Sequence, residues 1–284
     1  VAFHIAAALD AALTPEDRRR IRREPTANLE AYQLYLQGRH CFVRYTAEGM
    51  RKSIDYFQRA VERDPKYALA YVGIAFAHAE LLTTGAEDPV VGYRQGREAA
   101  ARALALDEGM AEAHCMMAQL MIQGEFDWVG AEAEFKRALE LSPNSADTLD
   151  LYGRMCAALE RYDEAIAMGR RAHELDPLAH RSDTATTLLR AGRYAEALDE
   201  ARSAVEFDPH YDRGHATLAW ALIMAGQRTE GVAELERAVE LSAGNSVAWK
   251  AQLGQAYALV GRVDDARRIL ADLESTPAAG YRSP

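Results

Sequence analysis

The chain has 284 residues, a formal net charge of −10 at pH 7 and a hydrophobic fraction of 49%. This acidic balance disfavours nonspecific binding to nucleic acid, and no apolar run reaches the roughly 18 residues that a membrane-spanning helix needs. Alanine, leucine, arginine and glutamate dominate, and all four are good helix formers. The composition therefore predicts an all-α protein whose helices pack closely through alanine.

The first 27 residues are expected to form helices that lead into the rest of the chain. The segment VAFHIAAALDAAL carries an apolar stripe, but it is short and lacks the basic leader of a signal peptide. Thr14 and Pro15 then make a good helix start, with threonine as N-cap and proline at the first helical position. Because the chain begins with Val1 rather than Met, we expect residues 1–27 to lead in from an upstream domain.

From residue 28 onward the sequence repeats a pair of amphipathic helices. In the clearest unit, NSADTLDLYGRMCAALERYDEAIAMGRRAHELDP at 144–177, Pro177 ends the second helix because it lacks an amide proton. Small residues recur at one position of each first helix and at two positions of each second helix: Gly38, Ala75, Ala118, Gly153, Ala185, Ala219 and Gly254; Ser53, Gly96, Ala131, Ala165, Ala197, Gly231 and Ala266; Ala60, Ala103, Ala138, Ala172, Ala204 and Ala238. A helix pair of 34 residues cannot bury its apolar face alone, so we expect the copies to stack.

These units resemble tetratricopeptide repeats, as the segments AYVGIAFAHAE, LLRAGRYAEALDEARSAVEFDP and AQLGQAYALVGRVDDARRIL illustrate. The resemblance covers about residues 28 to 276 and implies an all-α, right-handed superhelix of about seven helix–turn–helix repeats. We place the repeats at about 28–65, 66–108, 109–143, 144–177, 178–209, 210–243 and 244–276. The tail at 277–284 looks like the start of a further repeat.

The entry to the repeats carries a narrower resemblance. The run LTPEDRRRIRREPTANLEAYQLYLQGRH looks like the entry to the repeat region of bacterial adenylate or guanylate cyclases, winged-helix transcriptional regulators and serine/threonine kinases. In those proteins a catalytic or DNA-binding domain precedes the repeats. The resemblance implies that this chain is the regulatory part of a larger bacterial signalling protein.

Motifs for catalysis, cofactors and metals are missing from the sequence. It contains no Gly-rich phosphate loop, no H-E-x-x-H and no C-x-x-C. Cys41, Cys115 and Cys156 are odd in number and lack metal-ligand spacing, so we interpret them as small buried hydrophobes. His210 and His215 lie five residues apart and do not share a helix face. We therefore expect no enzyme, no cofactor and no metal site.

First helices of stacked repeats line the concave side, where a partner would bind. Carrying one register along the repeats gives a face of aromatics, arginines and amides, and aromatics and arginine are the types that carry interface energy. The candidate partner-binding residues are Tyr35, Arg39, Phe76, Glu80, Gln119, Asp150, Arg154, Arg213, Trp220 and Gln255, with Thr186 and Arg190 placed on the same face in the fifth repeat. Trp220 is the best single candidate, and packing against the next repeat is its alternative interpretation.

Two functions are favoured over a third, an enzyme in its own right, for which the sequence offers no motif. One is a non-catalytic scaffold that binds a peptide or a partner domain in the groove. The other is an intramolecular sensor arm that responds to a small ligand and reports to a cyclase, kinase or DNA-binding domain of the same polypeptide, without direct nucleic-acid binding. The three unpaired cysteines favour the cytoplasm, and the periplasm is the alternative because some related proteins place their repeats beyond a membrane.

Overall fold

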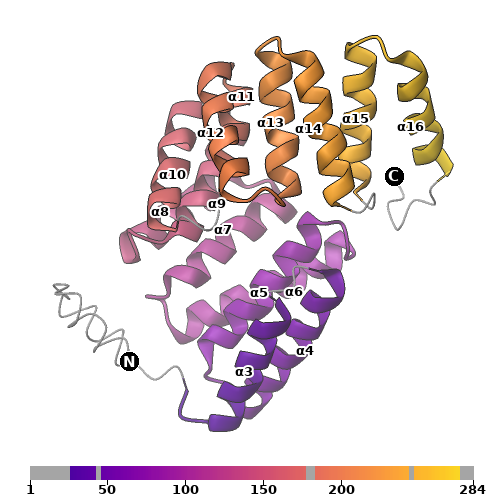
Figure 1. Ribbon diagram of the computed structural model, residues 1–284. Coiled ribbons are helices and arrows are strands. Elements are labelled where there is room, and N and C mark those ends of the chain that lie inside the picture. The colour runs from indigo at the N-terminus through magenta and orange to yellow at the C-terminus, as the bar shows by residue number, and fades with distance from the viewer. Residues whose placement is uncertain (1–25, 43–45, 177–182, 243–245, 276–284) are drawn as a thin grey trace. The chain divides into compact units, whose positions relative to one another are not determined.

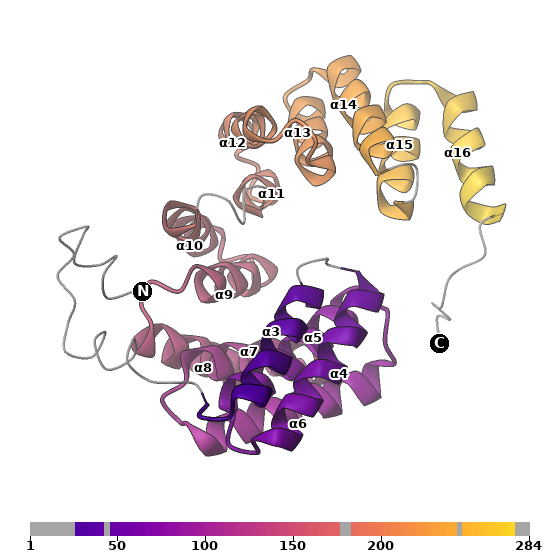
Figure 2. The same ribbon diagram turned by 60° about the horizontal axis from the view of Figure 1, so that its bottom comes forward.

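The computed structural model describes residues 26–42, 46–176, 183–242 and 246–275, and every regular element in these ranges is an α-helix (Figures 1 and 2). The prediction of an all-α fold is therefore confirmed. The helices expected before residue 26 and the tail at 277–284 lie outside the described residues. No helix among the described residues has the length and apolar character needed to cross a membrane.

The chain divides into two compact units, Val1–Asp127 and Trp128–Pro284. The described helices of the first unit are α3 (Leu29–Phe42), α4 (Ala47–Arg63), α5 (Ala68–Thr83), α6 (Pro89–Leu106) and α7 (Ala111–Glu125). Each helix packs against the next, and α5 also packs against α7. This is the arrangement expected of stacked helical hairpins.

The Phe57 side chain of α4 packs tightly between α3 and α5. A Cβ atom placed on Gly38 of α3 would lie 2.5 Å from the Phe57 ring, and one on Gly73 of α5 would lie 2.7 Å from it. The ring therefore fits between two helices only because both present glycine at the contact. Phe57 is 1% exposed, which shows how completely the two neighbouring helices cover it.

The second unit contains the remaining nine described helices. They are α8 (Trp128–Leu141), α9 (Ala146–Ala158), α10 (Tyr162–Leu175), α11 (Asp183–Arg190), α12 (Tyr194–Phe207), α13 (Asp212–Met224), α14 (Arg228–Leu241), α15 (Val247–Leu259) and α16 (Val263–Ser275). From α8 to α16 each helix packs against its successor in the chain. The helices of the second unit can be followed in order, from pink to yellow, in Figure 2.

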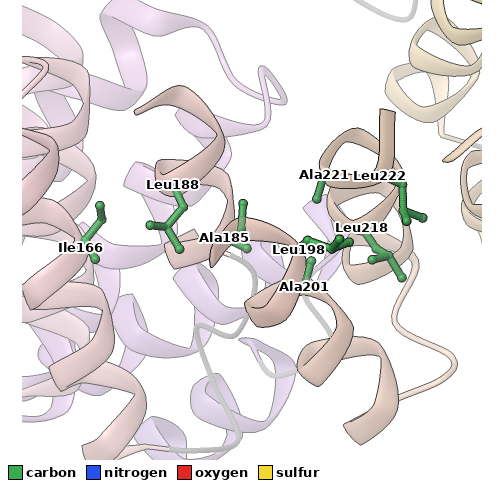
Figure 3. Close-up of a cluster of buried hydrophobic side chains, with 9 residues drawn as sticks. Ile166, Ala185, Leu188, Leu198, Ala201, Leu218, Ala221 and Leu222 are labelled. Atoms are coloured by element: carbon green, nitrogen blue, oxygen red, sulfur yellow. The ribbon is translucent and has the colours of Figure 1, made fainter. Parts of the chain in front are cut away.

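The small residues that recur in the sequence lie at the helix–helix contacts. In the second helix of successive hairpins, the alanines of one series are all 3% exposed or less: Ala60, Ala103, Ala138, Ala172, Ala204 and Ala238. Larger residues from the same hairpins fill the space between them. In Figure 3, Ile166 of α10, Leu188 of α11, Leu198 of α12 and Leu218 of α13 form one buried cluster with Ala185, Ala201, Ala221 and Leu222. Alanine lets the backbones approach, and leucine and isoleucine supply the buried apolar area.

The turn inside three hairpins of the second unit requires a left-handed backbone. Gly192, Gly226 and Gly261 have φ values of +74°, +89° and +82°. Glu160 occupies the corresponding position between α9 and α10 and has a φ of +60°. A side chain in this region costs about 1 kcal/mol that glycine avoids.

An arginine follows this turn position in three hairpins and connects successive repeats. Arg161 hydrogen-bonds Glu164 of its own hairpin at 2.9 Å and Glu132 of the preceding second helix at 3.0 Å. The same pattern joins Arg193 to Glu196 and Asp163, and Arg262 to Asp265 and Glu236. These contacts repeat with the hairpins and tie each second helix to the one before it.

Tyrosine reinforces two of these junctions. The Tyr152 hydroxyl donates to Glu132 at 2.8 Å, and the Tyr257 hydroxyl donates to Glu236 at 2.8 Å. Hydrogen bonds from Lys136, Arg161 and Tyr152 lower the pKa of Glu132 to about 2. Burial, with the Glu132 carboxylate adding to it, raises the pKa of Tyr152 to about 12. At neutral pH the carboxylate is thus ionised and the phenol keeps its proton.

Candidate functional site

The first helices of three successive hairpins in the second unit line an open hollow of about 560 Å³. Its walls come from α11, α13 and α15, and this volume lies within the range of small-ligand and peptide side-chain sites. The lining residues are Thr186, Leu189 and Arg190 of α11, Arg213, Ala216, Thr217, Trp220 and Met224 of α13, and Trp249 and Gln252 of α15. The hollow thus lies on the face that first helices were expected to present to a partner.

Trp220 forms part of the wall and is held in place by the next repeat. It is half-buried, and its indole Nε1–H donates to Gln252 Oε1 at 2.8 Å. Its ring also packs against the buried cluster that contains Leu235 and Leu253. Trp220 therefore does two things at once. It packs against the next repeat, and it lines the hollow where a partner could bind.

Trp249 forms a second bridge between the same two helices. Its indole Nε1–H donates to Asp212 Oδ2 of α13 at 2.9 Å. The backbone N–H of Arg213 donates to the other oxygen of Asp212 at 2.7 Å. Two tryptophan bonds thus cross between α13 and α15 in opposite directions, which orients both indole rings beside the hollow.

The hollow is positively charged, in contrast to the whole chain. Arg190 and Arg213 line it and both are exposed, whereas no Asp or Glu occurs among its described lining residues. Met224 adds exposed apolar surface, with half of its side chain open to water. Arginine, tryptophan and methionine are the residue types enriched at protein interfaces.

A second, smaller hollow of about 230 Å³ between α10 and α12 lacks these properties. Arg170 lines it and hydrogen-bonds both Glu196 and Glu200 at 3.2 Å. Its guanidinium is therefore already engaged by two carboxylates. We take the α11–α13–α15 hollow, defined by the ten lining residues above, as the candidate functional site.

In the second unit, the structure separates the sequence candidates into exposed and buried ones. Arg213 and Trp220 lie together in the α11–α13–α15 hollow. Gln255 is exposed on α15 but is not among the lining residues. Asp150 is 3% exposed and pairs with the exposed Arg154 across 3.8 Å. The side chain of Asp150 consequently offers almost no surface to a partner.

The sequence candidates of the first unit form smaller contacts of their own. Arg39 donates to the Tyr35 hydroxyl at 3.2 Å, and the Tyr35 ring lies 5.6 Å from Phe57. Phe76 is half-buried, with Glu80 half-buried one turn further along α5. Gln119 of α7 is only 8% exposed, so it contributes to the interior of the unit.

Leu189, Trp249 and Gln252 were not among the candidates from the sequence. Gln252 precedes the expected Gln255 by one turn of α15, and it faces α13 through its bond to Trp220. The signal that could have revealed Trp249 is its rarity, because the chain has only three tryptophans. Its position one turn after the N-cap Ser246 also indicates a contact with the preceding first helix.

The cysteines and histidines of the described chain do not assemble a metal site. No group of three or more His, Cys, Asp or Glu residues in the described ranges could hold a metal ion. Burial raises the pKa of Cys156 to about 11, which keeps this thiol protonated and unreactive. His215 is buried, with its ring nitrogens 2.6 Å from Glu234 Oε2 and 3.0 Å from the Pro209 carbonyl oxygen.

Comparisons with known proteins agree with the hairpin architecture. The family model described as "Tetratricopeptide repeat" matches residues 188–253, a segment that holds nine of the ten lining residues of the α11–α13–α15 hollow. A small glutamine-rich tetratricopeptide repeat-containing protein from Mycosarcoma maydis is 29% identical over 104 residues, which cover 36% of this chain and 30% of that protein. The transcriptional regulator HilA of Salmonella typhimurium is 24% identical over 174 residues, covering 61% of this chain and 31% of HilA.

A solved structure supports the same fold over most of the chain. A tetratricopeptide repeat protein from Parabacteroides merdae aligns with a TM-score of 0.59 and 14% identity, covering 88% of this chain and 94% of that one. At this identity the likeness concerns the fold alone. The present chain spans about a third of the length of the two curated relatives described above. Residues 188–253 thus match the tetratricopeptide repeat model, and the helical hairpins have the fold of a tetratricopeptide repeat protein.

Proposed function

We propose that this chain is a non-catalytic scaffold that binds a peptide or an extended segment of a partner protein in the α11–α13–α15 hollow. The observation that carries the proposal is the convergence of three first helices on one open hollow. Two indole rings and two arginines line it. Buried aromatic and arginine contacts supply most of the binding energy at protein interfaces.

Panning a library of random linear peptides on the intact chain tests this proposal. We expect families of peptides to be enriched whose binding is lost on Trp220→Ala and on Met224→Asp. Met224 is 50% exposed, so its substitution leaves the core of α13 untouched and separates binding from folding. Circular dichroism verifies that both variants remain helical.

Val129→Asp is the matched control. Val129 is an exposed apolar residue, 83% open to water, on α8 and outside the lining set of the α11–α13–α15 hollow. Peptides that bind the hollow should bind this variant as they bind the parent chain. The scaffold proposal for this site is refuted if no peptide family is enriched. It is also refuted if the enriched families bind the Met224→Asp variant with the same affinity as the parent chain.

We also propose that the repeats act as a regulatory part of a larger bacterial protein. The support is the similarity to the transcriptional regulator HilA over 61% of this chain, together with the resemblance of the first repeats to those of signalling proteins. The gene that encodes this chain provides the test. A cyclase, kinase or DNA-binding domain in the same reading frame is the expected result, and a reading frame that encodes repeats alone would contradict it.

A further inference from the structure

The polar groups of the α11–α13–α15 hollow are arranged mainly as hydrogen-bond donors. An indole N–H can only donate, so the Gln252 atom that lies 2.8 Å from Trp220 Nε1 must be the carbonyl oxygen. Gln252 therefore keeps both protons of its amide nitrogen for another acceptor, and it makes no other hydrogen bond within the described chain. Thr217 is the exception, because its hydroxyl proton goes to the Arg213 carbonyl at 3.0 Å, but Thr217 is only 8% exposed and presents little of its remaining acceptor capacity to a ligand.

The charged side chains at the hollow also favour a ligand that carries hydrogen-bond acceptors. Arg190 is exposed and forms no ion pair with any described residue, and Arg213 adds a second exposed guanidinium. Asp212 beside the hollow has both oxygens occupied, one by Trp249 and one by the backbone of Arg213. A guanidinium is always charged and binds carboxylates through paired hydrogen bonds. The site therefore complements a ligand that brings acceptors and negative charge.

The apolar part of the hollow favours a ligand with a bulky apolar side chain. Both indole N–H groups are satisfied within the protein, so what Trp220 and Trp249 offer a ligand is their ring surface. Met224 and the half-buried Leu189 extend this surface on either side. An aromatic or large aliphatic side chain gains most from such a surface because it buries the largest area and stacks on the rings.

We infer that the α11–α13–α15 hollow selects an extended acidic segment with a bulky apolar side chain, over basic or purely polar segments. The inference rests on the proposed scaffold function and specifies the chemistry of the partner. It follows from charge complementarity, because two arginines and, among the described lining residues, no carboxylate face the ligand. Glutamate or aspartate supplies the acceptors, and the apolar residue supplies the anchor.

Four labelled peptides of equal length test the inference by fluorescence anisotropy on the intact chain. Three carry a central Trp flanked on both sides by Glu, by Gln or by Lys, and the fourth carries a central Ala flanked by Glu. We expect the Glu–Trp peptide to bind tightest, the Gln and Ala peptides to bind about tenfold more weakly, and the Lys peptide to bind weakest. Added salt should reduce the advantage of the Glu–Trp peptide, because screening weakens exposed charge pairs.

Charge reversal in the protein provides the second arm. The double variant Arg190→Glu, Arg213→Glu should invert the order, so that the Lys-flanked Trp peptide binds better than the Glu-flanked one. The matched control is Arg202→Glu, Arg228→Glu, which makes the same change in net charge at exposed positions of α12 and α14 outside the lining set. This control should keep the order of the parent chain.

The outcomes distinguish the inference from the scaffold function on which it rests. Equal binding of the Glu, Gln and Lys peptides, or preference for the Lys peptide by the parent chain, would overturn the acidic preference. Failure of the Glu–Trp peptide to bind would overturn the inference as well. In either case, library peptides that depend on Met224 would leave the scaffold function standing. If the library also yields no such peptide, both proposals fail.

Discussion

Gly231 of α14 gives a test in which simple consensus and the geometry of the fold predict opposite results. The matching position in four other repeats is alanine, at Ala131, Ala165, Ala197 and Ala266. Replacing a helical glycine by alanine normally stabilises a protein by about 0.5–1 kcal/mol. A Cβ on Gly231, however, would lie 2.6 Å from the Ala219 carbonyl oxygen and 2.6 Å from Ile223 Cγ1.

The net effect follows from the two opposing terms. The contact at the Ala219 oxygen involves backbone, so α13 and α14 must separate to relieve it, and overpacking of this kind costs about 1–3 kcal/mol. Subtracting the gain of about 1 kcal/mol in helix propensity leaves Gly231→Ala less stable by about 1 kcal/mol. Urea unfolding followed by far-UV circular dichroism should show a lower midpoint than that of the parent chain.

Gly254→Ala is the matched control for this prediction. Gly254 belongs to the first-helix series in which most repeats carry alanine, and its added Cβ would meet only the Ile269 side chain, at 3.0 Å. A side chain can rotate away where a carbonyl oxygen cannot, so we expect Gly254→Ala to keep part or all of the gain in helix propensity and to raise the free energy of unfolding by up to about 1 kcal/mol. An unchanged or higher midpoint for Gly231→Ala would refute the argument from backbone contact.

Two further predictions concern the junctions between helices. Glu160→Gly should raise the free energy of unfolding by about 0.5–1 kcal/mol because it removes a side chain from a left-handed backbone. Gly226→Ala should lower the free energy of unfolding by about 1 kcal/mol for the opposite reason. A urea titration in which Gly226→Ala is more stable than Glu160→Gly would contradict this account. The pKa of Glu132, about 2 against an ordinary 4.5, means that the ionised carboxylate stabilises the fold above about pH 4.5 and that this stabilisation is lost as the pH falls toward 2. Glu132→Gln should therefore be less stable than the parent at pH 7, by about 1 kcal/mol, and should lose less stability on acidification; parallel pH profiles of the two proteins in thermal unfolding would show that the carboxylate has no such role.

The fold could be predicted from the sequence because small residues recur at the positions where helices contact each other. The buried alanines, such as Ala138 and Ala204, recur at one position of each second helix, and a helix–helix contact needs a small residue there. The short α11 and its neighbouring turn were harder to place, since the fifth repeat departs from the common length. Helix periodicity locates each element even where the loops vary.

The site could be predicted only in part, because exposure depends on the neighbouring helices. Asp150 was expected to face the groove, yet it is 3% exposed. Register along a single helix pointed to Trp220, which lines the hollow, but Trp249 and Gln252 of α15 face the preceding first helix. Gln252 enters the hollow through its hydrogen bond to Trp220, a contact between repeats that no single-helix pattern contains.

The placement of the tryptophans has a practical consequence. Two of the three indoles in the chain, Trp220 and Trp249, line the α11–α13–α15 hollow, and the third is Trp128 in α8. After Trp128→Phe, all tryptophan emission would come from the hollow itself. The protein would then report occupancy through its intrinsic fluorescence, in solution and without a label, and each peptide that reaches the two rings would register as a change in intensity or wavelength.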